Sequence, residues 1–300
     1  IGVHTLQEMA DVKFEVVCRA RGTVVLNADD PLCLAMAKRS KARRACLVSN
    51  AENPDLPAET LEHADSRCVV EPEAGIATIV IYDGAVRIPL VAVIDIPATF
   101  AGAAAHNISN AMHAAAACYF SGVPAATIAG ALRGFRMSFD TTPGRLNVFE
   151  GLPFRVIMDY AHNADGFRRI CALTDRQPVS GKKILMVGFS GDRQDVDIKA
   201  AATVLAGHFD HYVCRNFRGL RDRLPHEIPA LLKYSLMSAG IIDSRISIMP
   251  DADQAVQCSL GLAEPGDLVV LLVGATEFQS VWDLLHTMAE ARKLHPEVVA

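Results

Sequence analysis

The spacing of hydrophobic residues changes along the chain and predicts which segments form strands and which form helices. Short runs rich in β-branched residues indicate strands, whereas apolar residues three and four positions apart indicate helices. In the first part of the chain we expect strands at 23–28 and 46–49, three β-like runs within 67–96, and helices at 32–41, 106–121 and 125–135. Asp83-Gly84 lies between two of the β-like runs and is a typical hairpin turn.

In the second part, strand and helix patterns alternate regularly. Turn residues in Ser138–Gly144 favour a boundary there, so we expect one domain over 1–143 and another over 144–300. This alternation predicts an α/β fold with a parallel sheet and helices on both faces, whose ligands bind beyond the carboxyl ends of the strands. We expect strands at 154–158, 183–187, 209–214, 246–249 and 268–273, and helices at 164–176, 193–206, 225–238, 252–262 and 277–293.

The composition limits the classes of function that the chain can have. A net charge of −5 gives no electrostatic reason to bind nucleic acid or an acidic membrane, and no run reaches the roughly 20 apolar residues of a membrane helix. The eight cysteines contain no CxxC pair, which argues against a zinc site or a disulfide framework. We therefore expect a cytoplasmic protein that binds neither nucleic acid nor membrane. Ile1 begins in mid-pattern, so we also expect a longer parent chain.

Polar residues follow the first strand predicted in the second domain. Asp159-Tyr160-Ala161-His162-Asn163 comes directly after the strand that ends at Met158. Such groups at the end of a buried strand are costly unless they bind a ligand or cap the next helix. Either Asn163 caps that helix and Asp159 accepts backbone hydrogen bonds, or Asp159 holds ribose hydroxyls and His162 reaches a nucleotide.

A glycine-rich loop, Gly188-Phe189-Ser190-Gly191-Asp192-Arg193, follows the next strand and opens a helix. Glycines let the backbone approach a ligand, and the free N–H groups at a helix start favour an anion such as a carboxylate or a phosphoryl group. Alternatively, the loop is only a strand-to-helix turn in which Asp192 caps the helix. The loop is neither a GxGxxG dinucleotide fingerprint nor a GxSxG nucleophile elbow.

Three further groups have weaker local support. Arg145 follows Pro143-Gly144 at the boundary, where its planar fork suits a phosphate, although a surface arginine beside a tight turn explains it as well. Asn107 and Asn110 lie three apart on one helical face, where they either contact a purine edge or cap the helix start. Lys13 is most simply a solvated helix lysine. Local sequence favours the structural explanation for all three.

Several catalytic motifs are absent from the sequence. No GxxxxGK[ST] phosphate loop occurs, and His226-Glu227 lacks the second histidine of a zinc protease. A nicotinamide-dependent oxidoreductase would rest on the alternating sheet pattern alone, because GxGxxG is also missing.

Taken in order, the motifs resemble the Mur ligase superfamily, and most closely the C-terminal half of the cyanophycin synthetases. The resemblance implies that residues 1–143 are the distal part of a Mur-type central ATPase domain. Residues 144–300 would then be a doubly wound, mostly parallel C-terminal domain of Rossmann-like fold. The matching segments are Gly2–Lys13, Val25–Pro31, His106–Asn110, Thr142–Asn147, Asp159–Asn163, Gly188–Arg193, Arg218-Gly219 and Leu268–Val273.

The resemblance also implies an activity. Members of the superfamily use ATP and Mg²⁺ to phosphorylate a carboxylate, and an amine then attacks the acyl phosphate, so positioning and charge stabilisation supply most of the catalysis. In the cyanophycin synthetases this half adds arginine to an aspartate side-chain carboxylate of a polymer. The implied partners are an amino acid and an aspartate-containing peptide or polymer, and a homo-oligomer is left open.

The same resemblance assigns roles to individual residues. Lys13 matches a lysine that is carbamylated in many members and then helps to hold Mg²⁺, and together with His162 and Arg193 it is a catalytic candidate. Asn107 and Asn110 match a segment that contacts adenine. Arg145 and Asp159 match groups that reach the phosphates and the ribose. The residues that match the amino-acid site are Gly188, Ser190, Gly191, Asp192, Arg193 and Arg218.

Two departures from the superfamily bear on activity. The phosphate loop is missing, so we expect this chain alone to turn over no ATP. Arg215 stands where the superfamily tends to be acidic, and its charge would repel a guanidinium, which argues against arginine as the substrate. Two hypotheses follow: the distal part of an amino-acid ligase, and a degenerate, non-catalytic module for assembly or polymer binding. A phosphate loop upstream of Ile1 would favour the first.

Overall fold

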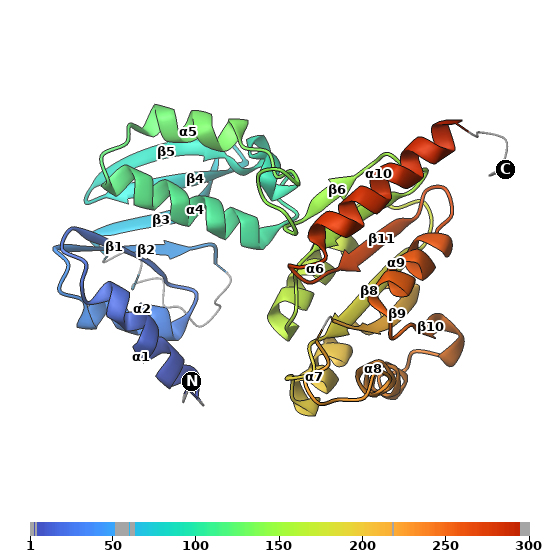
Figure 1. Cartoon of the computed structure of the whole chain (residues 1–300). Coiled ribbons are helices and arrows are strands. Elements are labelled where there is room, and N and C mark those ends of the chain that lie inside the picture. Colours follow the sequence, from blue (N-terminus) through green and yellow to red (C-terminus); the bar gives the residue numbers. More distant parts are fainter. Residues whose placement is uncertain (1–2, 4, 52–59, 61–63, 218, 295–300) are drawn as a thin grey trace. The chain divides into compact units, whose positions relative to one another are not determined.

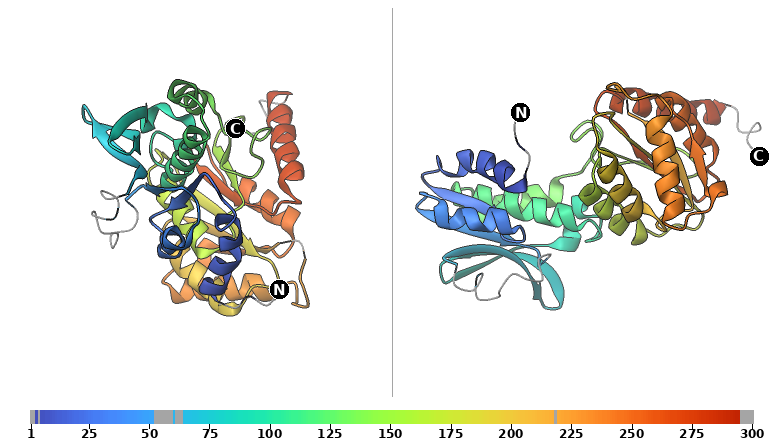
Figure 2. Two further views of the ribbon diagram at one scale, coloured as in Figure 1. Left: turned by 90° about the vertical axis from the view of Figure 1, so that its left-hand side faces the viewer. Right: turned by 90° about the horizontal axis from the view of Figure 1, so that it is seen from below.

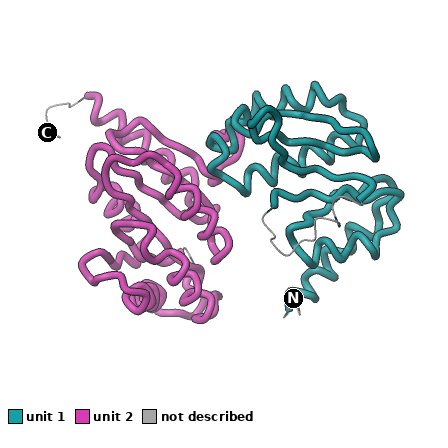
Figure 3. The backbone as a smooth tube through the Cα atoms, turned by 180° about the vertical axis from the view of Figure 1, so that it is seen from behind, with its two compact units in different colours: residues 1–136 teal, residues 137–300 magenta. Residues whose placement is uncertain are grey.

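The chain divides into two compact units, residues 1–136 and 137–300 (Figure 3). The computed structural model describes residues 3, 5–51, 60, 64–217 and 219–294. Arg218, one of the residues expected at the amino-acid site, lies outside these described residues. The segment just before residue 143 belongs to the second unit and forms a local turn, in which the Thr142 N–H donates to the Ser138 carbonyl over 2.9 Å.

The first unit contains a five-stranded mixed sheet covered by helices (Figure 1). The strand order is β1-β2-β3-β4-β5; the first three strands run parallel, and the last two continue antiparallel. The bounds are Leu6–Val17 (α1), Thr23–Asn27 (β1), Pro31–Arg39 (α2), Arg44–Ser49 (β2), Ser66–Glu73 (β3), Ile76–Asp83 (β4), Val86–Ala92 (β5), Ala105–Phe120 (α4) and Ala125–Gly134 (α5), with 3-10 turns at Val93–Asp95 and Pro97–Thr99.

Local sequence explains where these elements begin and turn. The Asp30 carboxylate accepts hydrogen bonds from the N–H groups of Leu32 and Cys33 and so caps α2, whose first residue is Pro31. Gly84 adopts a φ of +59° in the hairpin between β4 and β5, at the Asp-Gly turn predicted from the sequence. The buried core beside these elements comprises Ala10, Val24, Leu26, Ala28, Met36 and Leu47.

The second unit contains a six-stranded, doubly wound sheet. The strand order is β10-β9-β8-β11-β7-β6, and every neighbouring pair is parallel except β7 and β6. The bounds are Asn147–Phe149 (β6), Arg155–Asp159 (β7), Ala164–Asp175 (α6), Lys183–Phe189 (β8), Asp195–Leu205 (α7), His211–Asn216 (β9), Glu227–Ser238 (α8), Ile246–Ile248 (β10), Ala252–Gly261 (α9), Leu268–Leu272 (β11) and Phe278–Leu294 (α10), with a 3-10 turn at Asp243–Arg245.

Helices cover both faces of this second sheet. On one face α7 contacts both α6 and α8, whereas α9 and α10 pack in a separate core cluster against the strands (Figures 1 and 2). Strands buried from both sides are almost continuously apolar, as the run Leu268–Leu272 illustrates. The predicted α/β fold is therefore confirmed. The antiparallel edge strand β6 was not predicted, because three residues are too few to display a period.

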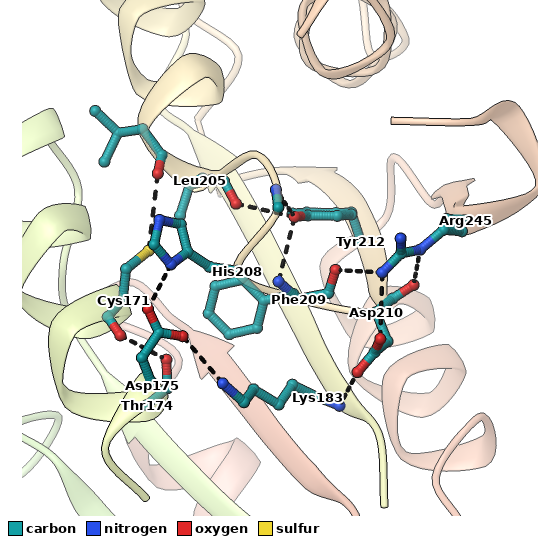
Figure 4. A network of polar contacts seen from close by, with 12 residues as sticks. Cys171, Thr174, Asp175, Lys183, Leu205, His208, Phe209, Asp210, Tyr212 and Arg245 are labelled. Carbon is teal, nitrogen blue, oxygen red and sulfur yellow. Dashed lines mark hydrogen bonds and ion pairs between the residues drawn. The ribbon is translucent and has the colours of Figure 1, made fainter. Parts of the chain in front are cut away.

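A polar network joins the amino ends of β8 and β9 to neighbouring turns (Figure 4). The Asp175 carboxylate accepts a hydrogen bond from Lys183 Nζ over 3.0 Å and lies 2.6 Å from Nδ1 of His208. Arg245 donates to the carbonyl oxygens of Asp210 and Phe209 over 2.6 and 2.8 Å. These side chains thus hold together the amino-terminal ends of the strands, which we call the amino edge of the sheet. It lies opposite the carboxyl-terminal ends, where ligands of such sheets bind.

The structure bears on two features considered in the sequence, membrane spans and cysteines. None of the described helices is long and apolar enough to span a membrane. All eight cysteines are unpaired, and four of them, Cys46, Cys68, Cys171 and Cys214, are buried. Burial raises the pKa of the Cys214 thiol to about 12, so this side chain behaves as a small apolar group.

Candidate functional site

The loops that the sequence predicts to bind ligands lie at the carboxyl-terminal ends of the parallel strands of the second sheet, which we call its carboxyl edge. The loops after β7, β8 and β9 lead to α6, α7 and α8, whereas the loop after β11 leads to α10 on the opposite face. Because β11 lies between β7 and β8, the loops diverge on either side of it. Such a switch point is where open α/β sheets bind ligands.

Asp159 ends β7 and is almost fully buried, with 8% of its surface exposed. One carboxylate oxygen accepts the Leu146 N–H over 3.0 Å, and the other accepts the Ala161 N–H over 2.7 Å. Burial raises the pKa of Asp159, although these amides and the guanidinium of Arg145 oppose the shift. Of the two roles that the sequence left open for Asp159, the structure shows the backbone hydrogen bonds, and contact with a ribose stays a prediction.

Arg145 lies in a loop whose backbone is held by hydrogen bonds and close packing. The Asn147 side chain closes the loop, because it accepts the Gly144 N–H over 2.6 Å and donates to the Thr142 carbonyl over 3.0 Å. Gly144 has a φ of +69°, and a Cβ there would meet the Phe278 ring at 2.1 Å, so only glycine fits. The Arg145 side chain itself is exposed, with its guanidinium 5.4 Å from the Tyr160 ring. The hydrogen-bonded loop thus presents a solvent-facing cation.

His162 and Asn163 lie in the turn that follows Asp159. Nδ1 of His162 lies 3.0 Å from the Tyr160 carbonyl, and the two rings are 4.9 Å apart. The Asn163 side chain accepts the Gly166 N–H over 2.8 Å and caps α6, which was the structural alternative considered for it. His162 is half-buried.

The glycine-rich loop Gly188–Arg193 packs tightly against the loop that follows β9. A Cβ on Gly191 would meet the Leu220 carbonyl oxygen at 1.7 Å, so the requirement for glycine there comes from this close packing. Helix α7 begins at Asp195 after a Gln194 cap, so Asp192 is not its cap. A hydrogen bond from Ser190, with Arg221 and Arg193 nearby, lowers the pKa of the exposed Asp192 carboxyl. Asp192 therefore presents a stable negative charge to solvent.

A buried ion pair lies beneath this loop and corrects one sequence interpretation. Arg215 is fully buried, and its guanidinium donates to both carboxylate oxygens of Glu277 over 2.9 and 2.7 Å. A Cβ on Gly188 would meet the Arg215 carbonyl oxygen at 2.5 Å, so this glycine makes room for the backbone of β9. The expectation that Arg215 repels a cationic substrate was wrong, because Glu277 neutralises it inside the protein.

Arg223 is a further residue of this edge that the sequence did not single out. It donates to the carbonyl oxygens of Gly191 and Arg193 over 3.1 and 2.7 Å, and to the carboxylates of Asp195 and Glu227 over 2.8 and 2.7 Å. Nothing in its exposed, charged sequence neighbourhood distinguishes it. Glu277 could have been found from the sequence, since it is a lone acid close after a buried strand, as Asp159 is.

The candidates in the first unit are arranged differently. Asn107 is buried on α4 and donates to the Ala98 carbonyl over 2.7 Å, while Asn110 donates to the Asn107 side chain over 3.3 Å. The two amides share a helical face as predicted, but neither caps α4, whose cap is Ala104. Lys13 is exposed on α1. Among the described residues, no group of three or more His, Cys, Asp or Glu side chains is placed to hold a metal ion.

The described part of the second unit also has a cavity of about 270 Å³ at the opposite, amino edge of its sheet. Its lining includes Phe154, Arg155 and Asp267, and the Asp267 carboxylate is already occupied by the N–H groups of Lys182 and Glu264. None of the candidate site residues lines it. We therefore place the candidate site at the carboxyl edge, where the polar loops converge.

Known proteins resemble both this sheet and the rest of the chain. Residues 144–275 match the family described as Mur ligase, glutamate ligase domain. Over most of its length the second unit is therefore similar to a Mur ligase domain. The chain is 30% identical over 271 residues to the cyanophycin synthetase of Crocosphaera subtropica, covering 90% of this chain and 30% of that protein. It is 32% identical over 277 residues to that of a Nostoc species, covering 90% of this chain and 29% of that protein.

The fold agrees with solved ligase structures. Escherichia coli FolC, in complex with DHPP and ADP, has a TM-score of 0.63 to this chain at 16% identity, over 96% of this chain and 58% of that one. At this identity the likeness shows the fold alone. The resemblance expected from the ordered motifs, to Mur ligases and to cyanophycin synthetases, is confirmed. The chain spans less than a third of the length of these synthetases.

Proposed function

We propose that this chain is the distal part of an ATP-dependent amino-acid ligase, and that its second unit holds the incoming amino acid. The similarity to cyanophycin synthetases over 90% of the chain carries the proposal. The convergence of Asp192, Arg193 and His162 at the carboxyl edge of a Mur ligase sheet supports it. In this account the amine of the amino acid attacks an acyl phosphate, an amide bond forms, and phosphate leaves.

The residues of this chain contribute positioning and charge to that reaction. Asp192 attracts the cationic part of the amino acid, and the half-buried Arg193 attracts its carboxylate. The exposed Arg145 meets the phosphoryl group, for which a guanidinium fork is well suited. Asp159 acts indirectly, because its bond to the Leu146 N–H fixes the loop that carries Arg145. His162, in the turn after Asp159, is placed to reach the nucleotide.

ATP and Mg²⁺ enter the proposal through the family rather than through these residues. No group of three or more His, Cys, Asp or Glu among the described residues is placed to hold a metal ion, and the sequence has no GxxxxGK[ST] loop for the β- and γ-phosphates. Carbamylated Lys13 as a metal ligand, and Asn107 and Asn110 as adenine contacts, remain predictions.

Arginine is the first amino acid to test. Arg215 no longer argues against it, because Glu277 pairs with this guanidinium in the interior. The exposed carboxylate of Asp192 is available for a substrate cation, although Arg221 lies 3.9 Å from it. Diaminopimelate is the second choice, because a Geobacillus kaustophilus ligase that takes 2,6-diaminopimelate is 31% identical to this chain over 169 residues.

The experiment is a titration of the ¹⁵N-labelled chain with L-arginine, meso-diaminopimelate and L-glutamate. We expect one of the three to shift the amide signals of residues 188–193 in a saturable way, while the amides around Asp175 at the opposite edge stay unchanged. Shifts confined to other surfaces, or none with any of the three, would reject the second unit as the amino-acid site. That result would favour a non-catalytic module.

A further inference from the structure

Two loops at the carboxyl edge of the second sheet are locked together by one side chain. Arg223, in the loop between β9 and α8, donates to four acceptors in or beside the β8–α7 loop and the start of α8. Two of these acceptors are the backbone carbonyls of Gly191 and Arg193, inside the candidate amino-acid loop. The other two are carboxylates on the first residues of α7 and α8, Asp195 and Glu227. Its side chain is only 17% exposed.

The backbone just before Arg223 is strained. Arg221 and Asp222 adopt φ angles of +45° and +72°, which non-glycine residues rarely take. Gly191 brings its backbone so near the Leu220 carbonyl that any Cβ would clash. The Gly191 N–H also donates to the Gly219 carbonyl over 3.4 Å. A strained loop and a close approach persist only when surrounding contacts hold them, and the Arg223 guanidinium supplies four hydrogen bonds here.

We propose that Arg223 is the positioning residue of the amino-acid site, holding the Gly188–Arg193 loop in the shape that presents Asp192 and Arg193 to the substrate. This inference rests on the proposed function. Arg223 does not touch the amino acid, because its donors are directed at the two carbonyls and the two carboxylates. Its role is to set where the backbone between Ser190 and Arg193 lies.

The chemistry favours arginine over lysine at this position. A guanidinium has five N–H donors in a rigid plane, so it can bind two carbonyls and two carboxylates at once. Lysine would keep the charge but has a single point of attachment. The two carboxylates also fix the orientation of the guanidinium, which leaves Nε and one terminal nitrogen directed at the loop carbonyls of Gly191 and Arg193.

The chain offers a matched control in Arg245. This arginine also donates to two backbone carbonyls and one carboxylate, those of Phe209 and Asp210, but at the opposite edge of the same sheet (Figure 4). Replacing it removes a comparable set of hydrogen bonds without touching the candidate site. A change that follows loss of Arg223 but not loss of Arg245 therefore reports positioning of the loop rather than general stability.

The test measures amide hydrogen exchange of the whole chain without ligand, and then its affinity for L-arginine. In Arg223→Ala we expect the amides of Gly191 and Arg193 to exchange about tenfold faster or more, because local opening becomes easier, with the β8 strand unchanged. We expect affinity for L-arginine to fall about 10- to 100-fold, as small misplacements of a binding loop do. Arg245→Ala should change neither reading, and Arg223→Lys should fall between wild type and Arg223→Ala.

Two results would overturn the inference. One is unchanged exchange at Gly191 and Arg193 in a folded Arg223→Ala variant, or in Arg223→Lys if the alanine variant does not fold. The other is an equal effect from Arg245→Ala, which would reduce Arg223 to a general stabiliser. If exchange rises as expected but wild type binds no L-arginine, meso-diaminopimelate or L-glutamate, then Arg223 does hold the Gly188–Arg193 loop in place, but the proposed function is wrong.

Discussion

Removing Glu277 while leaving Arg215 in place tests the role of the buried ion pair most sharply. Arg215 is fully buried, Glu277 is 2% exposed, and the two share a pair of hydrogen bonds of 2.9 and 2.7 Å. In Glu277→Leu the guanidinium keeps its hydrogen bonds to the backbone oxygens of Asn216 and Leu272 and its contact with the Phe217 ring, but no negative charge from Glu277. An arginine cannot give up its proton, so its charge stays buried and unpaired.

The expected cost is large. Breaking a buried pair from one side destabilises proteins by about 3–5 kcal/mol. For a domain of roughly this size each kcal/mol lowers the melting temperature by about 2–4 °C, so we expect a fall of roughly 6–20 °C. The reverse change, Arg215→Met, should cost less, because a carboxyl left alone can take up a proton. The double variant Arg215→Met/Glu277→Leu should be more stable than Glu277→Leu alone, since no charge is then buried.

Unfolding in urea, followed by tryptophan fluorescence, measures these differences in the right part of the molecule. Trp282 is the only tryptophan in the sequence, and it packs against Phe139 and Phe149 in the second unit. Its emission therefore reports that unit by itself, which a chain of two units requires. The reasoning would be refuted if Glu277→Leu cost less than about 1 kcal/mol, or if the losses of the two single variants simply added in the double variant.

Three further predictions concern turnover and pH. The purified 300 residues should release no phosphate from ATP with any amino acid, because no GxxxxGK[ST] loop holds the β- and γ-phosphates; amino-acid-dependent release would refute this. In an active ligase that contains this chain, Arg145→Ala should lower kcat at least about tenfold while changing stability by under about 0.5 kcal/mol, since the side chain is exposed, and Arg133→Ala should leave the rate unchanged. Burial alone would raise the pKa of Asp175, but hydrogen bonds from Lys183 and His208 outweigh it and lower this pKa. Asp175 therefore stabilises the fold above its unfolded pKa of 3.8 and loses this contribution as pH falls through the folded value. Asp175→Asn should thus be less stable than wild type at pH 7, with the gap closing in acid; a gap independent of pH would contradict this.

The fold followed from the sequence wherever hydrophobic periods were long. Every strand and helix expected in the second unit is present, because strands such as Leu268–Leu272 are buried on both faces and so read as continuous apolar runs. Strand β6 escaped notice, since its three residues display no period. The motif residues converge on one edge because the carboxyl ends of parallel strands do so.

The parts that sequence reasoning missed all depend on contacts between distant segments. Arg215 was interpreted as a repulsive charge because its partner, Glu277, is far away in the sequence. The sequence explained Gly188 and Gly191 by approach of a ligand, which stays a prediction; it did not show that a Cβ at either would clash with the β9 backbone or the Leu220 carbonyl. Sequence patterns locate the polar groups, but tertiary contacts decide which of them are already occupied.

The most direct test of the central claim is ligation itself. The whole gene product that carries this sequence would be incubated with ATP, Mg²⁺, an aspartate-bearing primer peptide and L-arginine, and the primer mass would be followed. The account predicts that the primer gains one amino-acid residue for each phosphate released, and that Arg145→Ala suppresses both. A gene product that contains a phosphate loop, yet leaves the primer mass unchanged with L-arginine, meso-diaminopimelate and L-glutamate alike, would contradict it.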